Sequence, residues 1–254
     1  MYRIKNMEMY SKCIVAFLDI LGFKNMINTK AFEEIREIFS NVIPQSDFCL
    51  ALGRAAYDDD DDKVLNQYND VLSKTKMHIM SDSIIIAAPV GYPEALAVVI
   101  DICDVIQEQL YDLEVPVFLR GAIAEGDFYL DEQLIFGKGL VDAYVAQENY
   151  AVYPRIIVSD AVVKGKTVSV DSEWKKLPRD KDGYFYINTL ERYFQCKTLD
   201  EFVTNGQVKK ITQCVDSRLQ GYADSHLRDK YIWIRQELER IKHNLAFDNN
   251  IVMI

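Results

Sequence analysis

The sequence lacks the features that would suit a nucleic-acid, membrane or extracellular protein. Acidic residues outnumber basic ones by 39 to 29, and the formal net charge is −10. Binding to a nucleic-acid duplex or to an anionic membrane would require a basic face instead. No apolar run approaches the roughly 18 residues of a membrane span, and the first residues contain no apolar signal core. We therefore expect a cytoplasmic protein with neither nucleic acid nor membrane as its main partner.

Several common chemical motifs are also missing. The five cysteines are scattered, with no CxxC pair and no histidine at ligand spacing, so we expect reduced thiols and neither a disulfide framework nor a zinc site. The chain has no GxxxxGK[ST] loop and no GxSxG elbow. Gly137-Lys138-Gly139 lacks the third glycine and the early position of a dinucleotide-binding loop. The P-loop, serine-hydrolase and dinucleotide-binding classes are therefore not indicated.

What the sequence does contain is a buried strand that ends in an acid. The apolar run from Ile14 to Leu18 stops at Asp19 and turns through Leu21-Gly22-Phe23 into an expected helix. A carboxylate at that point is unfavourable unless a cation neutralises it, and the glycine would let exposed N–H groups approach a ligand. A metal-bound phosphate satisfies both conditions. An aspartate that only caps the following helix fits these residues equally well.

A second acid occurs at another predicted strand end. Residues 76–88 are typical of two strands joined at Ser81-Asp82-Ser83. Asp19 and Asp82 would then form the pair of hard carboxylate ligands that two-metal phosphoryl chemistry requires. Arg120 lies in the apolar strand expected over 115–124, where a guanidinium needs an anionic partner.

The expected elements follow the order strand, helix, hairpin, helix, strand, hairpin, helix, strand. This order predicts an α+β sandwich of the ferredoxin-like βαββαβ type. The main helices are expected over residues 30–41, 93–108 and 139–148, and a long amphipathic helix over 228–245. The acidic run YDDDDDK at 57–63 predicts a solvated loop.

Five segments together resemble the catalytic domain of class III nucleotidyl cyclases. They are FLDILGFKNM, IMSDSIII, LRGAIAEGDFYL with IFGKGLVDAY, and YPRIIVSD. The resemblance covers about residues 9–190 and leaves 191–254 as a C-terminal helical extension. Its most specific part is the pairing of DILGF with SDS. Within this superfamily the chain is most similar to the bacterial anti-phage Pycsar-type cyclases, which make cyclic CMP or cyclic UMP and share a KYxW-like stretch, here at 230–233.

The resemblance implies roles for the residues around the two acids. Asp19 and Asp82 would bind two Mg²⁺ or Mn²⁺ ions, with the backbone of Ile20 as a further ligand. The N–H groups of the turn formed by Leu21, Gly22 and Phe23 would hold the triphosphate.

The resemblance also implies a head-to-tail homodimer with composite sites at its interface. Lys76 or Tyr144 would contact the nucleobase. Purine cyclases carry an Asn and, four residues on, an Arg that stabilise the transition state, and the nearest residues here are Asp142 and Ala146. We expect Arg120 and Arg155 to supply the missing positive charge.

The implied reaction converts CTP or UTP into the 3′,5′-cyclic nucleotide and pyrophosphate. The product would be a second messenger in anti-phage defence, acting on a cyclic-nucleotide-responsive effector. Two alternatives stay open. One is a cyclase-like domain that has lost its chemistry and senses a nucleotide, and the other is a cyclase for ATP or GTP with unusual base contacts.

Overall fold

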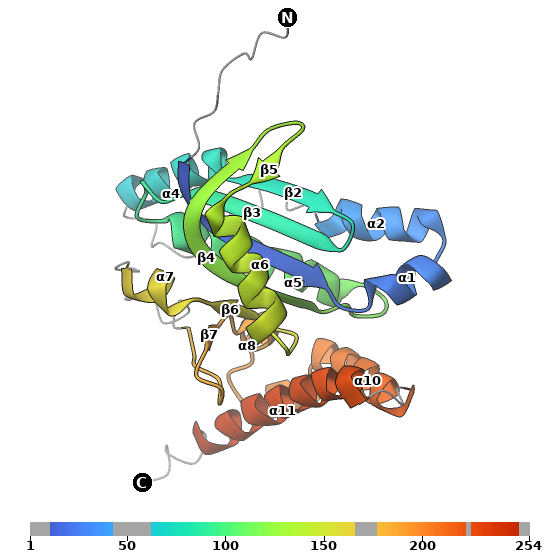
Figure 1. The fold of residues 1–254 in the computed structure, drawn as a ribbon. Helices are drawn as coiled ribbons and strands as arrows, with labels where there is room; N and C mark the ends of the chain where they lie inside the picture. The colour runs from blue at the N-terminus through green and yellow to red at the C-terminus, as the bar shows by residue number, and fades with distance from the viewer. Residues whose placement is uncertain (1–10, 43–61, 166–176, 222–224, 249–254) are drawn as a thin grey trace, which may run out of the picture.

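The computed structural model describes residues 11–42, 62–165, 177–221 and 225–248, and a mixed β-sheet forms its centre (Figure 1). The strand order is β2-β3-β1-β4-β6-β7, and β5 pairs with β4 alone. Among β2, β3, β1 and β4 every pairing is antiparallel, whereas β6 runs parallel to β4. The strands are β1 (Ser11–Ile20), β2 (Lys76–Met80), β3 (Ser83–Pro89), β4 (Leu119–Leu130), β5 (Ile135–Phe136), β6 (Ile156–Val158) and β7 (Phe185–Tyr186).

The helices complete the predicted ferredoxin-like arrangement. Figure 1 shows α5 behind the sheet, α6 across its front, and α10 and α11 below it. The order β2-β3-β1-β4, with helices between β1 and β2 and between β3 and β4, is the βαββαβ topology and confirms the predicted α+β class. The helices are α1 (Phe23–Thr29), α2 (Phe32–Val42), α4 (Asp62–Lys74), α5 (Ala95–Asp112), α6 (Lys138–Tyr150), α7 (Asp160–Gly165), α8 (Thr189–Phe194), α9 (Leu199–Thr204), α10 (Gly206–Gly221) and α11 (Ser225–Asp248).

The central strand β1 separates two hydrophobic layers. Ile14, Ala16 and Leu18 are buried in the large core that the sheet shares with α5. Val15 and Phe17 belong to a smaller cluster on the opposite side of the sheet, which α6 covers. Because successive side chains of a strand point to opposite faces, this alternation places Asp19 on the α6 side.

Two glycines explain how closely α6 approaches the sheet. A Cβ atom on Gly126 of β4 would lie 2.5 Å from the backbone nitrogen of Gly139 in α6. A Cβ on Gly139 would lie 2.9 Å from a methyl carbon of Val15. Such contacts are too short for any larger residue, so Gly139 in the Gly137-Lys138-Gly139 segment serves helix packing.

The boundaries differ from the predicted ones in two regions. The strand predicted over 115–124 is β4, which begins at Leu119 and continues to Leu130. The hairpin after it turns at Asp131, whose carboxylate accepts the N–H groups of Gln133 and Leu134 at 2.8 and 2.7 Å. Helix α4 was not predicted. It begins at Asp62, so the predicted loop over 57–63 is wrong for its last two residues, and the remainder lies outside the described part of the chain.

The C-terminal helices pack against the β6–β7 end of the sheet and form a second core with it. The predicted apolar stripe of α11 is buried there, through Tyr231, Ile234, Leu238 and Ile241. The ring of Tyr231 meets that of Phe118 edge-on at 6.0 Å. Within the described ranges, no helix is both long and apolar enough to cross a membrane.

Candidate active site

The structure brings the two predicted acids together. Asp19 lies opposite Ser83 in the β1–β3 register, and the Ile20 N–H donates to the Asp82 carbonyl at 3.0 Å. Asp82 occupies the two-residue turn between β2 and β3, where Ser81 has a left-handed φ of 59°. Both aspartates therefore lie at the same end of the sheet, where the neighbouring strands β1 and β3 end and begin.

Arg120 is the direct partner of Asp19. The two residues are opposite each other in the β1–β4 register, and the Arg120 Nε donates to the Asp19 carboxylate at 2.6 Å. A second guanidinium nitrogen of Arg120 lies 3.3 Å from the carboxylate of Glu148, near the end of α6. The side chains of Asp19 and Arg120 are only 18% and 20% exposed. Arg120 thus has the anionic partner that a guanidinium in an apolar strand needs.

The charges at this edge of the sheet favour an additional cation. Burial raises the pKa of Asp19, the hydrogen bond and charge of Arg120 oppose that rise, and the charge of Asp82 adds to it. The direction of the shift shows that one guanidinium does not fully compensate the carboxylate. A divalent ion beside Asp19 would stabilise its ionised form.

The donor set fits magnesium or manganese better than zinc. In the part of the chain that the structure describes, no three His, Cys, Asp or Glu side chains converge on one point. Mg²⁺ is commonly bound by one or two carboxylates together with water and substrate phosphates, whereas zinc sites use three or four protein ligands. Asp19 and Asp82, with the backbone of Ile20, would hold such ions together with water and substrate phosphates.

The turn after β1 begins α1 as expected, but its N–H groups are not equivalent. The Leu21 N–H donates to the Phe118 carbonyl at 2.9 Å and is therefore committed to the edge of the sheet. Gly22 has φ 82° and open space where a Cβ would stand, and it precedes the first residue of α1. The N–H groups of Gly22 and Phe23 have no intrahelical acceptor, because they precede the first helical hydrogen bonds. Of the three residues expected to bind the triphosphate, Gly22 and Phe23 have N–H groups available for it, whereas that of Leu21 is already hydrogen-bonded.

Arg155 does not join this site, which corrects its predicted catalytic role. It forms ion pairs with Asp180 and Asp182, and its side chain is 1% exposed. The guanidinium carbon lies 5.5 to 5.9 Å from the ring centroids of Tyr153, Tyr186 and Trp233. Two carboxylates already neutralise this cation and three aromatic rings enclose it, so it has no access to a phosphate.

Of the two predicted base-contacting residues, Lys76 lies apart from Asp19 within one chain, whereas Tyr144 lies on the same side of the sheet as Asp19. Lys76 is at the opposite end of β2 from Asp82, with its ammonium 3.4 Å from the Leu130 carbonyl. Tyr144 projects from α6, is 47% exposed, and meets Phe17 edge-on at 5.3 Å. Lys76 could therefore reach a nucleotide bound at Asp19 only from a second copy of the chain. Tyr144 packs on Phe17, which lies two residues before Asp19 on the same face of β1.

Two charged residues of the site were not predicted. Glu148 contacts Arg120 from the last turn of α6. Lys230 of α11 is half-buried; burial lowers its pKa, Arg120 lowers it further, and Asp19 and Glu148 raise it. The apolar stripe through Tyr231 indicated that this helix segment would be docked, but no feature of the sequence indicated where it docks.

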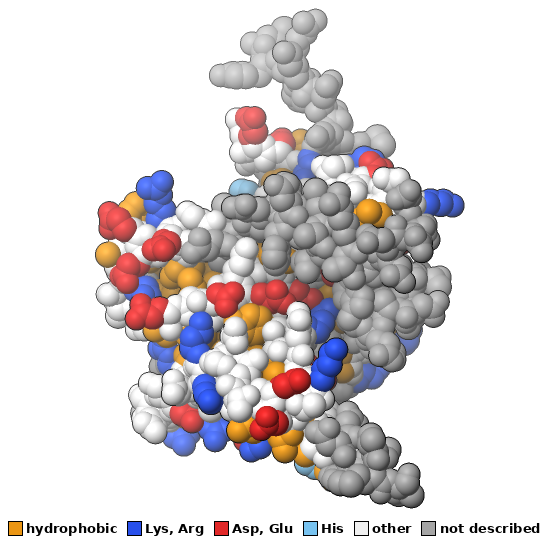
Figure 2. All heavy atoms as spheres, turned by 180° about the vertical axis from the view of Figure 1, so that it is seen from behind, with side chains coloured by type: hydrophobic (Ala, Val, Ile, Leu, Met, Phe, Trp, Pro, Cys, Tyr) orange, Lys and Arg blue, Asp and Glu red, His pale blue; other side chains and the backbone are white. Residues whose placement is uncertain are grey.

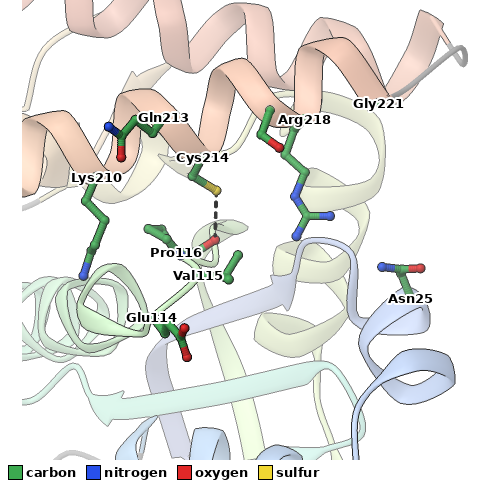
Figure 3. A pocket seen from close by; sticks show the side chains of 10 residues that line it. Asn25, Glu114, Val115, Pro116, Lys210, Gln213, Cys214, Arg218 and Gly221 are labelled. Carbon is green, nitrogen blue, oxygen red and sulfur yellow. Dashed lines mark hydrogen bonds between the residues drawn. The ribbon is translucent and has the colours of Figure 1, made fainter.

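A cavity of about 590 Å³ lies close to the start of α1 (Figure 3). Figure 3 shows Lys210 and Arg218 of α10 above it, the loop before β4 beneath, and Asn25 of α1 at one side. Neither Asp19 nor Asp82 lines this cavity. We therefore do not take it as the catalytic pocket, since Asp19 faces the α6 side of the sheet.

Several nucleotide cyclases are among the solved structures that match this chain, at low identity and with TM-scores below 0.5. No protein-family model matches the sequence, and no curated protein matches it. The solved structures that match include the guanylyl cyclase Cya2, with 11% identity and a TM-score of 0.42 over 70% of this chain and 93% of that one. A bacterial light-regulated adenylyl cyclase has 12% identity and a TM-score of 0.42 over 81% and 99% of the two chains. The adenylate/guanylate cyclase/hydrolase from Silicibacter pomeroyi has 15% identity and a TM-score of 0.42 over 70% and 95%.

Proposed function

We propose that the protein is a pyrimidine nucleotide cyclase that converts CTP or UTP into the 3′,5′-cyclic nucleotide and pyrophosphate. The observation that carries this proposal is the meeting of Asp19 and Asp82 at one edge of the sheet, beside Arg120. The resemblance of DILGF, SDS and their neighbouring segments to Pycsar-type cyclases supports the choice of a pyrimidine substrate. The product would signal to a cyclic-nucleotide-responsive effector in anti-phage defence.

The residues at the site have separable tasks in this reaction. The ribose 3′-OH attacks the α-phosphate of the same nucleotide, and pyrophosphate leaves. When bound, two divalent ions would supply the charge that activates the hydroxyl and stabilises the leaving group. Asp19 and Asp82 would hold these ions, and Gly22 and Phe23 would donate N–H groups to the triphosphate. Arg120, already beside Asp19, would face the negative charge that develops on the α-phosphate and would replace the arginine missing at Ala146.

The proposed homodimer uses the apolar surface on the α6 side of the sheet. Large apolar side chains of the hairpin and of α6 are exposed there: Leu134, Phe136, Val141, Tyr144 and Val145. An apolar group of this kind on a soluble protein is typical of an interaction surface. On the opposite face, acidic and basic side chains are interspersed among the described residues (Figure 2). A head-to-tail contact through α6 would bring Lys76 or Tyr144 of the second copy to the nucleotide.

A charge placed in this surface tests the dimer. We expect Val141→Glu to give a monomer at micromolar concentration and to lose most cyclase activity, because a carboxylate would be buried at the contact without a partner. Analytical ultracentrifugation gives the oligomeric state. Val203 of α9 is similarly exposed, at 51%, and Val203→Glu serves as the matched control that should leave both properties unchanged. A dimeric, active Val141→Glu protein would rule out this interface.

The activity itself is tested by incubating the purified protein separately with CTP, UTP, ATP and GTP in the presence of Mn²⁺. We expect cyclic CMP or cyclic UMP and an equal amount of pyrophosphate, both measurable by chromatography. Cyclic AMP or cyclic GMP would instead identify a purine cyclase. Nucleotide-dependent thermal stabilisation without any cyclic product would favour a sensing domain and would overturn the proposed reaction.

A further inference from the structure

Lys230 of α11 is a cation beside the candidate active site. Its side chain is half-buried and lies within electrostatic range of Asp19, Arg120 and Glu148. Within the described ranges it makes neither a hydrogen bond nor an ion pair. The nearby Arg120, by contrast, contacts both Asp19 and Glu148 directly. A half-buried ammonium next to a guanidinium is unfavourable unless an anion comes to it.

The position of Lys230 is fixed by the packing of α11. The next residue, Tyr231, is 4% exposed and lies against the ring of Phe118. One turn further along, the indole N–H of Trp233 donates to the Asp180 carboxylate at 2.9 Å. The Tyr186 hydroxyl donates to Glu237 at 3.0 Å. These contacts hold this segment of α11 against the sheet and prevent Lys230 from moving away as a free surface lysine would.

The same packing places Lys230 next to the turn expected to hold the triphosphate. Phe118 contacts Tyr231 through its ring, and its carbonyl accepts the N–H of Leu21, the first residue of that turn. Leu21 and Tyr231 also belong to the same hydrophobic cluster. A phosphate chain that runs from the Asp19 carboxylate to the N–H groups of Gly22 and Phe23 would therefore pass close to the Lys230 ammonium.

We propose that Lys230 binds the β- and γ-phosphates of the nucleotide, so that the C-terminal extension completes the active site of its own chain. The inference rests on the proposed function for the identity of the substrate. Arg120, which contacts Asp19 directly, is the cation nearest the α-phosphate. Lys230 is close to Asp19 but does not contact it. This position fits the β- and γ-phosphates, which lie further from Asp19 than the α-phosphate and leave as pyrophosphate. Pyrophosphate, the leaving group, should bind to the same ammonium.

The direct test measures binding of pyrophosphate and of a 3′-deoxynucleoside triphosphate, which cannot cyclise, by calorimetry in the presence of Mn²⁺. We expect Lys230→Gln to weaken both by about ten- to a hundredfold, as loss of one charge-assisted hydrogen bond does. Lys230→Arg should recover part of the affinity, because it keeps a cation at that position. Lys242→Gln is the control, since Lys242 lies on the same helix and is 47% exposed. The melting temperatures of all variants should match that of the unmodified protein.

The outcomes separate this inference from the proposed reaction. Unchanged affinity for pyrophosphate in Lys230→Gln, or no binding of pyrophosphate by the unmodified protein, would overturn the role of Lys230 even if the protein forms a cyclic nucleotide. Binding that depends on Lys230 in a protein that makes no cyclic product would support the phosphate contact and reject the cyclase. In an active enzyme, Lys230→Gln should raise the KM for the nucleotide at least as strongly as it lowers kcat.

Discussion

Replacing Asp19 by asparagine should reduce cyclic nucleotide formation by about 1000-fold or more while the protein stays folded. Asparagine keeps the size of the side chain but removes the charge that would hold the divalent ions. A 1000-fold loss corresponds to a rise of about 4 kcal/mol in the activation free energy. The fold should survive because Arg120 retains Glu148 as an anionic partner. Turnover with Mn²⁺ and CTP or UTP, together with a thermal melt, measures both parts of this expectation.

A matched control separates loss of the site from a general effect of lost charge. Asp70 of α4 is 48% exposed, and its ion pair with Lys74 is at the surface, so Asp70→Asn should leave activity unchanged. Asp82→Asn should behave as Asp19→Asn does, because both acids belong to one site. An Asp19→Asn enzyme with more than about a tenth of normal turnover would show that Asp19 serves only as the ion-pair partner of Arg120.

Replacing Arg155 by methionine should lower the free energy of unfolding by about 3–5 kcal/mol. The substitution removes the buried cation from between three aromatic rings and leaves the carboxylate of Asp180, which is only 12% exposed, and that of Asp182 without it. Breaking a buried ion pair by removing one partner is costly because the remaining charge stays desolvated. Urea unfolding followed by tryptophan fluorescence measures the change, since Trp233 lies directly at this cluster.

The control for Arg155 is an arginine in a surface ion pair. Arg235 pairs with Asp216, and both side chains are 42% exposed, so Arg235→Met should cost less than about 1 kcal/mol. Adding Asp180→Asn and Asp182→Asn to Arg155→Met should restore part of the stability, because the unpaired charges are then removed. A stable Arg155→Met protein that has lost its cyclase activity would return Arg155 to the catalytic role predicted from the sequence.

The ferredoxin-like topology could be predicted because its signals are local. The apolar run through Leu18, the polar turn at Asp82 and the helical spacing over 93–108 each fix one element, and their order fixes the fold. Helix α4 was missed because its start lies within an acidic run that is typical of loops. Its Tyr68 and Val71 are nevertheless fully buried, so tertiary packing outweighed the local signal.

The pairing of charges could be predicted only in part. Arg120 lies within an apolar strand and Arg155 follows Pro154 at the start of another, but the sequence does not identify the ion-pair partner of either. They differ in partners that are remote in the chain: Arg120 meets Asp19 through strand pairing, whereas Arg155 meets two aspartates in the loop before β7. For the same reason Lys230 could not be placed, since its position depends on how α11 packs against Phe118.

The central claim is that Asp19 and Asp82 share divalent cations with a nucleoside triphosphate. The most direct measurement is the anomalous scattering of manganese in crystals grown with Mn²⁺ and 3′-deoxy-CTP, which cannot cyclise. We expect manganese between the two carboxylates, with metal–oxygen distances of about 2.2 Å and the triphosphate along Gly22 and Phe23. Manganese bound elsewhere, with Asp19 still paired only to Arg120 and the nucleotide remote from both acids, would contradict it.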